Sequence, residues 1–374
     1  MTTVGVGLIG HAFMGRAHSQ AWRNVGAFFE PELTPLMTAL AGRSAERTAR
    51  AARALGWASA ETDWKALLRR DDVQLIDICT PGDGHAEIAI AALDAGKHVL
   101  CEKPLANTVA EAEAMTDAAD RAAAKGIVAM VGFNYRRIPA IALARNLVAQ
   151  GRLGTVRHIR AQYLQDWLTD PEAPWTWRMD RERAGSGALG DIGAHIVDAA
   201  QFITGDTLTE VSGTLHTFTG TRPHPDGRKP VTVDDSAIFT ARTAGGALAT
   251  FEATRLATGR KNALRIEISG TTGALAFDLE ALNELWLLDD HDTTAGFRRI
   301  LVTEPDHPYA GAWWPPGHLL GYEHTFTHQA ADLLNAIANR SAPSPSFADG
   351  LQVQRVLAAV QQSAAAQSTW TPIR

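Results

Sequence analysis

The chain has 374 residues, enough for two domains that each bury a core of their own. An apolar share of 45% with a charged share of 20% is typical of a globular protein, and the net charge of −6 argues against a surface for nucleic acid or anionic membranes. No apolar run approaches the roughly 20 residues that span a bilayer, and the N-terminus has no secretory signal, so we expect a cytoplasmic protein.

The first 135 residues alternate short apolar runs with longer Ala-rich stretches, in which apolar residues recur every three or four positions. This alternation of strands and helices predicts a parallel sheet covered on both faces, the doubly wound arrangement of a Rossmann domain. The expected strands are Val4–Ile9, Leu36–Ala41, Leu75–Cys79, His98–Cys101 and Val128–Gly132, and the expected helices include Ser44–Leu55, Ala86–Ala95 and Val109–Lys125.

The pattern changes after Arg136, where strand-like segments joined by short turns predict a large, mostly antiparallel sheet in an α+β domain over residues 136–374. We expect this domain to bind the substrate and to offer a broad face for self-association, as a homodimer or homotetramer. The expected strands are Val156–Leu164, Leu208–Thr219, Val231–Ala241, Ala247–Arg255 and Leu264–Gly270; the expected helices are Ala140–Gln150, His324–Asn339 and Gly350–Ala365; Gly220–Lys229 is expected to be an exposed loop.

The first strand leads into Gly10-His11-Ala12-Phe13-Met14-Gly15, which matches the dinucleotide-binding pattern except that Ala12 replaces the middle glycine. A tight turn at Gly10 would aim the amides of the next helix at a pyrophosphate. We therefore predict that Gly10, Ala12, Phe13 and Met14 bind a nicotinamide dinucleotide. The alternative is a plain strand–helix turn.

The end of the second expected strand, Ala41-Gly42-Arg43-Ser44, lacks the carboxylate that reads the ribose 2′-hydroxyl of NAD. Arg43 is instead suited to pair with a 2′-phosphate, and Ser44 to donate to it, which favours NADP over NAD. The alternative is that Arg43 is a solvated residue at the start of a helix or stacks on adenine.

The chain holds two cysteines, Cys79 and Cys101, without the spacing of a zinc or redox pair. Its 13 histidines include no His-Glu-x-x-His motif. We therefore expect buried, reduced thiols and no bound metal.

Four further segments carry a family resemblance. They are Cys79-Thr80-Pro81 followed by His85, the run Ala95–Pro104 that ends in Glu102-Lys103-Pro104, the glycine-rich Gly185–His195, and Phe347–Gly350 before the last helix. Together they resemble the Gfo/Idh/MocA family, named for glucose–fructose oxidoreductase, inositol dehydrogenase and a rhizopine-catabolism protein. The resemblance covers nearly the whole chain and implies an NAD(P)-dependent oxidoreductase acting on CH–OH groups.

Within that family, Tyr163–Trp167 together with Trp177-Arg178 is most similar to levoglucosan-dehydrogenase-like and inositol-dehydrogenase-like members. The chain departs from the common pattern at Ala12, at Gly42 in the acid position, and in an insertion around Phe28–Pro35. The first two departures bear on the choice of coenzyme and leave the expected fold unchanged.

The resemblance implies Lys103, Asp191 and His195 as the catalytic set. Oxidation of a secondary alcohol needs a base for the hydroxyl proton and an acceptor for the hydride. We expect His195 to be the base and Lys103 to hold the substrate oxygen and stabilise its developing charge. Asp191 lies four residues before His195, so a helix would place both on one face, where Asp191 binds substrate or tunes nearby charges; the alternative is a surface pair.

Further site residues follow from the same resemblance. Thr80, Pro81, His85, Glu102 and Lys103 are expected to line the coenzyme site at the carboxyl ends of the parallel strands. Planar polar groups and aromatic faces suit a polyol, and the candidates for binding it are Tyr135, Gln165, Trp167 and Arg178, with Asp191 and His195.

The predicted substrate is a sugar, anhydrosugar, glycoside or cyclitol that is oxidised at a secondary hydroxyl, with hydride transfer to C4 of the nicotinamide. One rival is a redox-assisted glycosidase that retains its NAD and shows no net reduction of coenzyme. Another is a non-catalytic sensor of sugar and NAD on the same fold, which predicts loss of the lysine or the histidine.

Overall fold

The computed structural model describes residues 2–289 and 293–374. The chain divides into two compact units. The first comprises Met1–Asn134 and Gly321–Gln352, and the second comprises Tyr135–Leu320 and Val353–Arg374. The two ends of helix α10 (Phe347–Ala365) therefore belong to different units.

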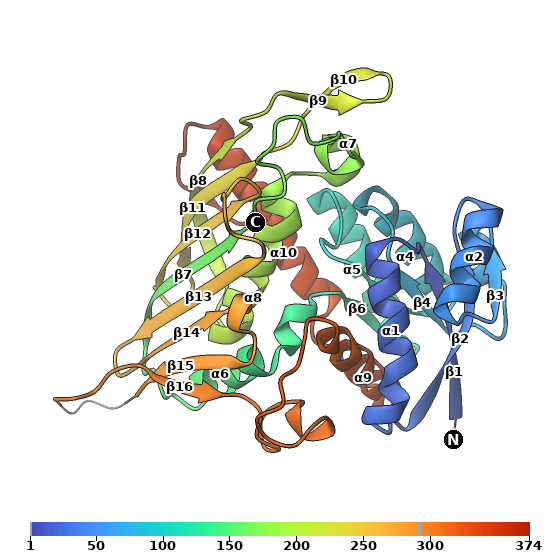
Figure 1. Cartoon of the computed structure of the whole chain (residues 1–374), viewed down its shortest axis with the longest axis horizontal. Coiled ribbons are helices and arrows are strands. Elements are labelled where there is room, and N and C mark those ends of the chain that lie inside the picture. The colour runs from blue at the N-terminus through green and yellow to red at the C-terminus, as the bar shows by residue number, and fades with distance from the viewer. Residues whose placement is uncertain (1, 290–292) are drawn as a thin grey trace. The chain divides into compact units, whose positions relative to one another are not determined.

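The first unit is built on a six-stranded sheet that is parallel throughout (Figure 1). Its strand order is β3-β2-β1-β4-β5-β6, so the order reverses beside β1, where ligands bind in open α/β sheets. The strands are β1 (Thr2–Ile9), β2 (Leu33–Ala41), β3 (Ser59–Glu61), β4 (Leu75–Ile78), β5 (His98–Cys101) and β6 (Ala129–Val131). The predicted Rossmann sheet is confirmed, with the short β3 added to it.

The helices between these strands begin and end at residues with a clear physical role. The α2 helix starts after Ser44, whose side chain accepts a hydrogen bond from the Arg47 N–H, and it stops at Gly56, where φ is +85°. Thr108 and Glu111 form a reciprocal capping box at the start of α5. The helices are α1 (Phe13–Phe28), α2 (Ala45–Leu55), α3 (Trp64–Leu68), α4 (His85–Asp94) and α5 (Val109–Ala123).

Helix α9 (His324–Asn339) returns from the far end of the chain to pack on α1 within the first unit. Phe326, Leu333 and Leu334 of α9 are buried in one cluster with Trp22 and Val25 of α1. The sequence prediction assigned this segment to the second domain, because its apolar stripe does not reveal which partner it covers. The predicted boundary at residue 135 stays a prediction, and the structure groups Gly321–Gln352 with the first unit.

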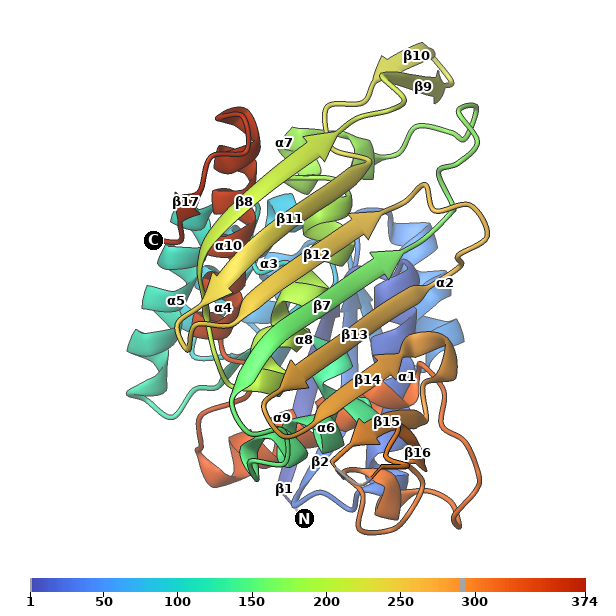
Figure 2. The same cartoon turned by 90° about the vertical axis from the view of Figure 1, so that its left-hand side faces the viewer.

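The second unit contains a nine-stranded sheet with the order β16-β15-β14-β13-β7-β12-β11-β8-β17 (Figure 2). Every pairing is antiparallel except β7 with β12, which confirms the predicted mostly antiparallel sheet. The strands are β7 (Val156–Leu164), β8 (Leu208–His216), β11 (Ser236–Thr243), β12 (Leu248–Thr254), β13 (Ala263–Gly270), β14 (Ala274–Asp278), β15 (Glu284–Leu288), β16 (Arg298–Leu301) and β17 (Thr371–Pro372).

One segment predicted as a loop is a hairpin. Within Gly220–Lys229 the chain forms β9 (Thr221–His224), which pairs with β10 (Gly227–Pro230). Its Pro and Gly content suggested irregular structure, but Gly227 sits at the tight turn with φ of +116°. Arg222 of this hairpin is buried and donates to the carbonyls of Leu168 and Asp170, which ties the hairpin to the unit.

Helices α6 (Pro139–Ala149) and α8 (Ala194–Thr204) contact each other and one side of the large sheet. Side chains alternate along β11: Phe239 is buried and stacks on Phe251, whereas Ile238 is 58% exposed. The exposed face fills the view in Figure 2, with the helices of this unit behind it. Among the described residues, no helix combines the length and the apolar character that crossing a bilayer requires.

Candidate active site

The predicted coenzyme residues follow the carboxyl ends of neighbouring parallel strands. Gly10 follows β1, Thr80 follows β4, and Lys103 follows β5. Backbone hydrogen bonds continue just beyond the strands, from Cys79 N to the Ile9 carbonyl and from Glu102 N to the Ile78 carbonyl, each at 2.9 Å. These loops therefore start from one edge of the sheet, the edge at which dinucleotides bind in this architecture.

The glycine turn leaves no room for larger residues. Gly10 has φ of +97°, and a Cβ there would lie 2.7 Å from the Cys79 carbonyl oxygen. A Cβ on Gly15 would lie 2.1 Å from the carbonyl oxygen of Gly10. Helix α1 begins at Phe13 without a side-chain cap from Ala12, so the amides of its first turn remain available to an anion. The turn fits the pyrophosphate of a dinucleotide.

The end of β2 is built without an acid. A Cβ on Gly42 would lie 2.8 Å from the His11 ring and 2.6 Å from the Thr48 hydroxyl oxygen, so a carboxylate at this position would displace one of them. Arg43 is exposed and Ser44 caps α2. The end of β2 therefore presents the Arg43 cation, whereas the common dinucleotide-binding pattern has a carboxylate there that binds the ribose.

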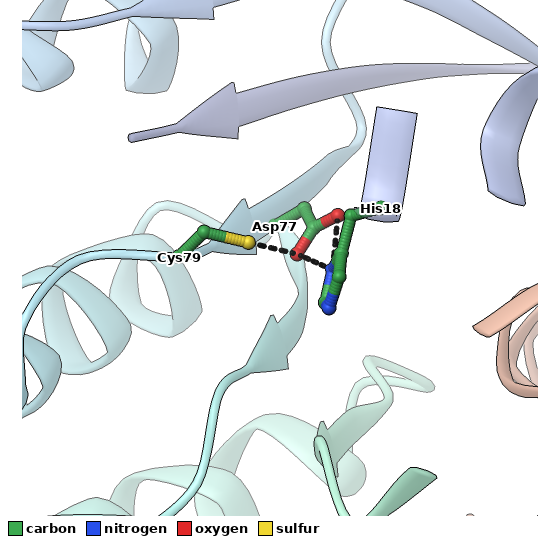
Figure 3. Close-up of side chains that lie close together, drawn as sticks. All are labelled: His18, Asp77 and Cys79. Carbon is green, nitrogen blue, oxygen red and sulfur yellow. Dashed lines mark hydrogen bonds and ion pairs between the residues drawn. The ribbon is translucent and has the colours of Figure 1, made fainter. Parts of the chain in front are cut away.

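A chain of buried charged groups lies in the core of the first unit and was not predicted. His18, on α1, has its Nδ1 2.9 Å from Asp77 Oδ1 and its Nε2 3.0 Å from Glu102 Oε1. All three side chains are at most 5% exposed. Asp77 also accepts hydrogen bonds from Trp22 Nε1 at 2.7 Å and from the Cys79 thiol (Figure 3).

The charges in this chain of groups follow from its geometry. An ionised carboxylate only accepts hydrogen bonds, so an imidazole held between two of them donates from both nitrogens and is positively charged. Burial alone would lower the pKa of His18, but Asp77 and the neighbouring groups raise it well above its usual value. Burial and the Asp77 charge raise the pKa of the Cys79 thiol, which stays protonated. His18, Asp77 and Cys79 have the spacing of metal ligands, but these hydrogen bonds already account for their arrangement.

Glu102 connects this chain of groups to the predicted catalytic lysine. Its Oε2 accepts a hydrogen bond from the backbone N–H of Lys103 at 3.2 Å, while its Oε1 faces His18. His85 is also buried, with Nε2 3.0 Å from the Thr80 carbonyl and Nδ1 3.0 Å from the Pro104 carbonyl. His85 thus joins the loop after β4 to the loop that carries Lys103.

In the second unit, Asp191 is paired with a buried arginine that was not predicted. Arg255 Nη2 donates to Asp191 Oδ2 at 2.8 Å, and the Arg255 guanidinium lies over the Trp167 ring, 5.3 Å from its centre. Arg255 is 1% exposed, whereas the Asp191 side chain is 28% exposed. The ion pair therefore holds an accessible carboxylate against a buried cation.

A close backbone contact explains the glycine-rich motif before Asp191. A Cβ on Gly187 would lie 1.7 Å from the Asp234 carbonyl oxygen, and the Asp234 carboxylate accepts hydrogen bonds from the N–H groups of Gly187 and Leu189. We expected Asp191 and His195 on one continuous α-helix. Asp191 instead lies in a π-helical turn, Leu189–Gly193, that leads into α8, and such turns are frequent at functional sites.

His195 lies among tyrosine rings at the start of α8. Its ring centre is 4.5 Å from that of Tyr135 and 6.0 Å from that of Tyr163, and only 8% of the residue is exposed. Tyr135 belongs to the turn Asn134–Arg137, which Arg136 anchors to α8 through a buried ion pair with Asp198 at 2.6 Å. This ion pair therefore joins the two backbone segments beside the imidazole, the turn that carries Tyr135 and helix α8.

A hydrogen-bond chain runs from these tyrosines to the predicted polyol-binding residues. The Tyr135 and Tyr163 hydroxyls are 2.8 Å apart, and Tyr163 donates to Asn262 Oδ1 at 2.8 Å. Gln165 donates to the same Asn262 oxygen at 2.8 Å, and Trp167 Nε1 donates to Gln165 Oε1 at 3.0 Å. Five of the predicted residues of the second unit are thus brought together: Asp191, His195, Tyr135, Gln165 and Trp167.

Arg178 makes a local contact instead. It lies in the turn Trp177–Met179, where its guanidinium stacks over the Trp177 ring at 4.6 Å. This contact is with its neighbour in the chain, so it does not tie Arg178 to the group around His195. The role of Arg178 in substrate binding stays a prediction.

The residues that sequence reasoning missed are charged or polar groups in apolar surroundings. Asp77 is the only charged residue of the buried strand β4, and Arg255 directly follows β12. A charged residue inside a buried strand is uncommon and could have marked Asp77. The partners of these residues, His18 and Asp191, lie 59 and 64 residues away, and the sequence gives no signal for such pairings.

Comparison with known proteins agrees with this geometry. A family model described as an oxidoreductase family with an NAD-binding Rossmann fold matches residues 4–133, and one for the GFO/IDH/MocA C-terminal domain matches residues 141–276. Levoglucosan dehydrogenase of Pseudarthrobacter phenanthrenivorans is 42% identical over 391 aligned residues, covering 100% of this chain and 99% of that protein.

Solved structures extend the likeness to the whole chain. An oxidoreductase domain protein from Kribbella flavida has a TM-score of 0.98 at 67% identity, with 100% of both chains covered. A levoglucosan dehydrogenase in complex with NADH and levoglucosan has a TM-score of 0.96 at 42% identity, again with 100% of both chains covered.

The fold, the glycine turn and these matches define an oxidoreductase with an NAD-binding Rossmann domain. The predicted class of enzyme is thereby confirmed. The chain belongs to the Gfo/Idh/MocA family. Use of NAD is supported at the level of the family, whereas the predicted preference for NADP stays a prediction.

Proposed function

We propose that the protein oxidises a secondary hydroxyl of a sugar, anhydrosugar, glycoside or cyclitol with a nicotinamide coenzyme. The observation that carries the proposal is the grouping in the second unit of a buried imidazole, an accessible carboxylate, two side-chain amides and an exposed tryptophan face. Amides and carboxylates bind sugar hydroxyls, and an aromatic face covers sugar C–H groups. The 42% identity with levoglucosan dehydrogenase, whose name states an anhydrosugar as substrate, supports the same class.

His195 is the proposed general base. Removal of the hydroxyl proton requires an imidazole held in one orientation, and the stacking with Tyr135 at 4.5 Å supplies that restraint. A bound nicotinamide coenzyme would accept the hydride at C4. The Tyr135–Tyr163–Asn262 hydrogen bonds keep the tyrosine beside the imidazole fixed.

Lys103 and Asp191 are the proposed partners of His195. Lys103 would hold the substrate oxygen, because an ammonium stabilises the negative charge that develops as the proton leaves. Asp191 would accept a hydrogen bond from a neighbouring substrate hydroxyl, since its side chain is 28% exposed while Arg255 holds the carboxylate at Oδ2. Gln165 and Trp167 would bind the rest of the polyol.

The coenzyme choice is the finer part of the proposal. We propose that Arg43, with Ser44, allows a 2′-phosphate and favours NADP over NAD. The exposed guanidinium beside Gly42, and the lack of space for an acid at that position, support this proposal. The NADH complex of the 42% identical levoglucosan dehydrogenase shows that NADH binds that relative, so the preference has to be measured for this chain.

Two further expectations join the proposal. A second copy of the chain is the proposed partner for the exposed face of the nine-stranded sheet, as a homodimer or homotetramer, because Ile238 and Leu248 on that face are 58% and 50% exposed. A cytoplasmic location is proposed because Cys79 and Cys101 are both free and buried.

The experiment that tests the function is a panel of monosaccharides, anhydrosugars, glycosides and inositols, each assayed for coenzyme reduction with NAD and with NADP. Stoichiometric formation of reduced coenzyme with one polyol class supports the dehydrogenase. Release of an aglycone without net reduction would identify a redox-assisted glycosidase instead. Binding of coenzyme and sugar without any turnover would identify a sensor.

A further inference from the structure

The chain of buried charged groups in the first unit ends at the backbone of the proposed catalytic lysine. Asp77, His18 and Glu102 follow one another through contacts of 2.9 and 3.0 Å, and Glu102 then accepts the Lys103 N–H at 3.2 Å. These three charged side chains come from α1, the end of β4 and the end of β5. They therefore link the helix of the glycine turn to the loop of Lys103 without passing through solvent.

The surrounding residues are shaped around these charges. A Cβ on Gly132 would lie 2.9 Å from Glu102 Oε1, so glycine keeps the space that the carboxylate occupies. Phe326 of α9 packs against the His18 ring, with 5.3 Å between the two ring centres. Trp22 and the Cys79 thiol also donate hydrogen bonds to Asp77. The second nitrogen of the imidazolium faces Glu102.

Stability alone does not account for this arrangement. Burying three charged groups costs desolvation energy, and apolar residues of similar volume often replace buried ion pairs without loss of stability. We propose that His18 and Asp77 are positioning residues: the buried imidazolium, balanced by Asp77, holds Glu102 ionised against the Lys103 backbone and fixes the turn that carries Lys103. The proposal rests on the catalytic role proposed for Lys103.

The titratable groups that face His18 set its behaviour with pH. They are Asp77 and Cys79 from the β4 end and Glu102 after β5, while α9 contributes the uncharged Phe326 ring. Burial raises the pKa of the Cys79 thiol, so it remains neutral. Without the imidazolium, Asp77 and Glu102 would share the cavity as two carboxylates, and their repulsion would favour protonation of one of them.

The decisive variant is His18→Gln, which keeps hydrogen-bonding capacity and removes the charge. We expect its kcat to fall on the order of tenfold at pH 7, with the coenzyme dissociation constant changed less than about threefold. The ratio of variant to wild-type kcat should rise with pH, because Glu102 loses the proton it has gained and again offers a charged, stronger acceptor to the Lys103 N–H. In His18→Gln combined with Glu102→Gln, which cannot ionise, the ratio should stay flat.

His98→Gln is the matched control. His98 is a half-buried histidine in β5 of the same sheet, where its Nδ1 accepts the Val128 N–H, and burial lowers its pKa to about 4, so it carries no charge. Its replacement can weaken the fold but should give a kcat ratio that does not change with pH. A flat ratio in His18→Gln, or an equal slope in His98→Gln, would overturn the proposal.

A second measurement does not depend on catalysis or on a folded variant. In wild-type protein labelled with ¹⁵N-histidine, one of the 13 histidines should remain doubly protonated well above the ordinary pKa of a histidine. A spectrum in which every histidine becomes a neutral tautomer near that ordinary pKa would overturn the proposal. Full turnover by Lys103→Met would instead refute the catalytic assignment of Lys103, while the ¹⁵N result still reports the charge of His18.

Discussion

His18 and His195 are both buried, at 1% and 8% exposure, but they have opposite kinds of neighbours. His18 faces two carboxylates and is held as a cation, whereas His195 lies between the rings of Tyr135 and Tyr163. The carboxylates around His18 are at most 5% exposed, while the carboxylate of Asp191, near His195, is 28% exposed. The first arrangement suits holding a loop in place, and the second suits meeting a substrate.

The largest expected effects come from the two groups that are proposed to act on the substrate itself. His195→Ala and Lys103→Met should each lower kcat by about 10²–10⁴-fold, because each removes a group proposed to handle the proton or the charge of the reacting oxygen. The measurement is steady-state turnover with the best substrate of the panel, with coenzyme affinity measured by quenching of protein fluorescence. Coenzyme binding should survive in each variant. Near-normal turnover in both would remove the catalytic assignment of His195 and Lys103.

Arg255→Met should have the next largest effect. Loss of the buried cation leaves Asp191 without its 2.8 Å partner, and we expect kcat/KM to fall on the order of a hundredfold, with partial recovery in Arg255→Lys. The structure offers a matched control in Arg242, which pairs with Glu210 at 2.6 Å and lies over Trp370 at 4.7 Å, at an exposed position of β11.

Arg242→Met should leave kcat/KM within about twofold, because exposed ion pairs contribute little. If the two arginine variants behave alike, Arg255 serves the fold of the second unit and not the orientation of Asp191. A thermal unfolding midpoint for each variant separates a loss of folded protein from a loss of activity.

The sequence predicted most successfully what depends on local pattern. The glycine turn at Gly10 and the alternation of strands and helices follow from near-neighbour chemistry, and the structure confirms the parallel sheet. The motif Gly185–His195 was found through family resemblance, but the π-helical turn at Asp191 was not, and neither was the hydrogen bond from Leu189, at the start of this turn, to Asp234, 45 residues further along the chain.

What the sequence could not show are contacts between distant segments. The pairings of His18 with Asp77 and of Asp191 with Arg255 join different elements, and no periodicity encodes them. The same limit explains why the sequence placed α9 in the second domain whereas the structure groups it with the first unit, since an apolar stripe shows that a helix is covered and not which element covers it. The hairpin within Gly220–Lys229 was missed because turn-forming composition occurs in hairpins as well as in loops.

A smaller effect tests the corner at the end of β2. Arg43→Ala should weaken NADP by about 10- to 100-fold and NAD by less than about threefold, because only NADP offers a phosphate for a charge-assisted hydrogen bond. Dissociation constants for both coenzymes, measured at one ionic strength, give the comparison. Equal weakening of the two would show that Arg43 does not read the phosphate and would favour its alternative role, stacking on adenine.

The smallest effect concerns the far end of the hydrogen-bond chain from His195. Gln165→Ala removes a donor to Asn262 and an acceptor for Trp167, so we expect KM for the polyol to rise about five- to tenfold while kcat changes little. Gln162→Ala is the control, because Gln162 lies on β7, the strand that Gln165 directly follows, and donates to Glu252 at 3.0 Å. Should Gln165→Ala lower kcat as strongly as it raises KM, the amide would be orienting Tyr163 and through it the imidazole, and the division between binding and chemistry within the second unit would have to be redrawn.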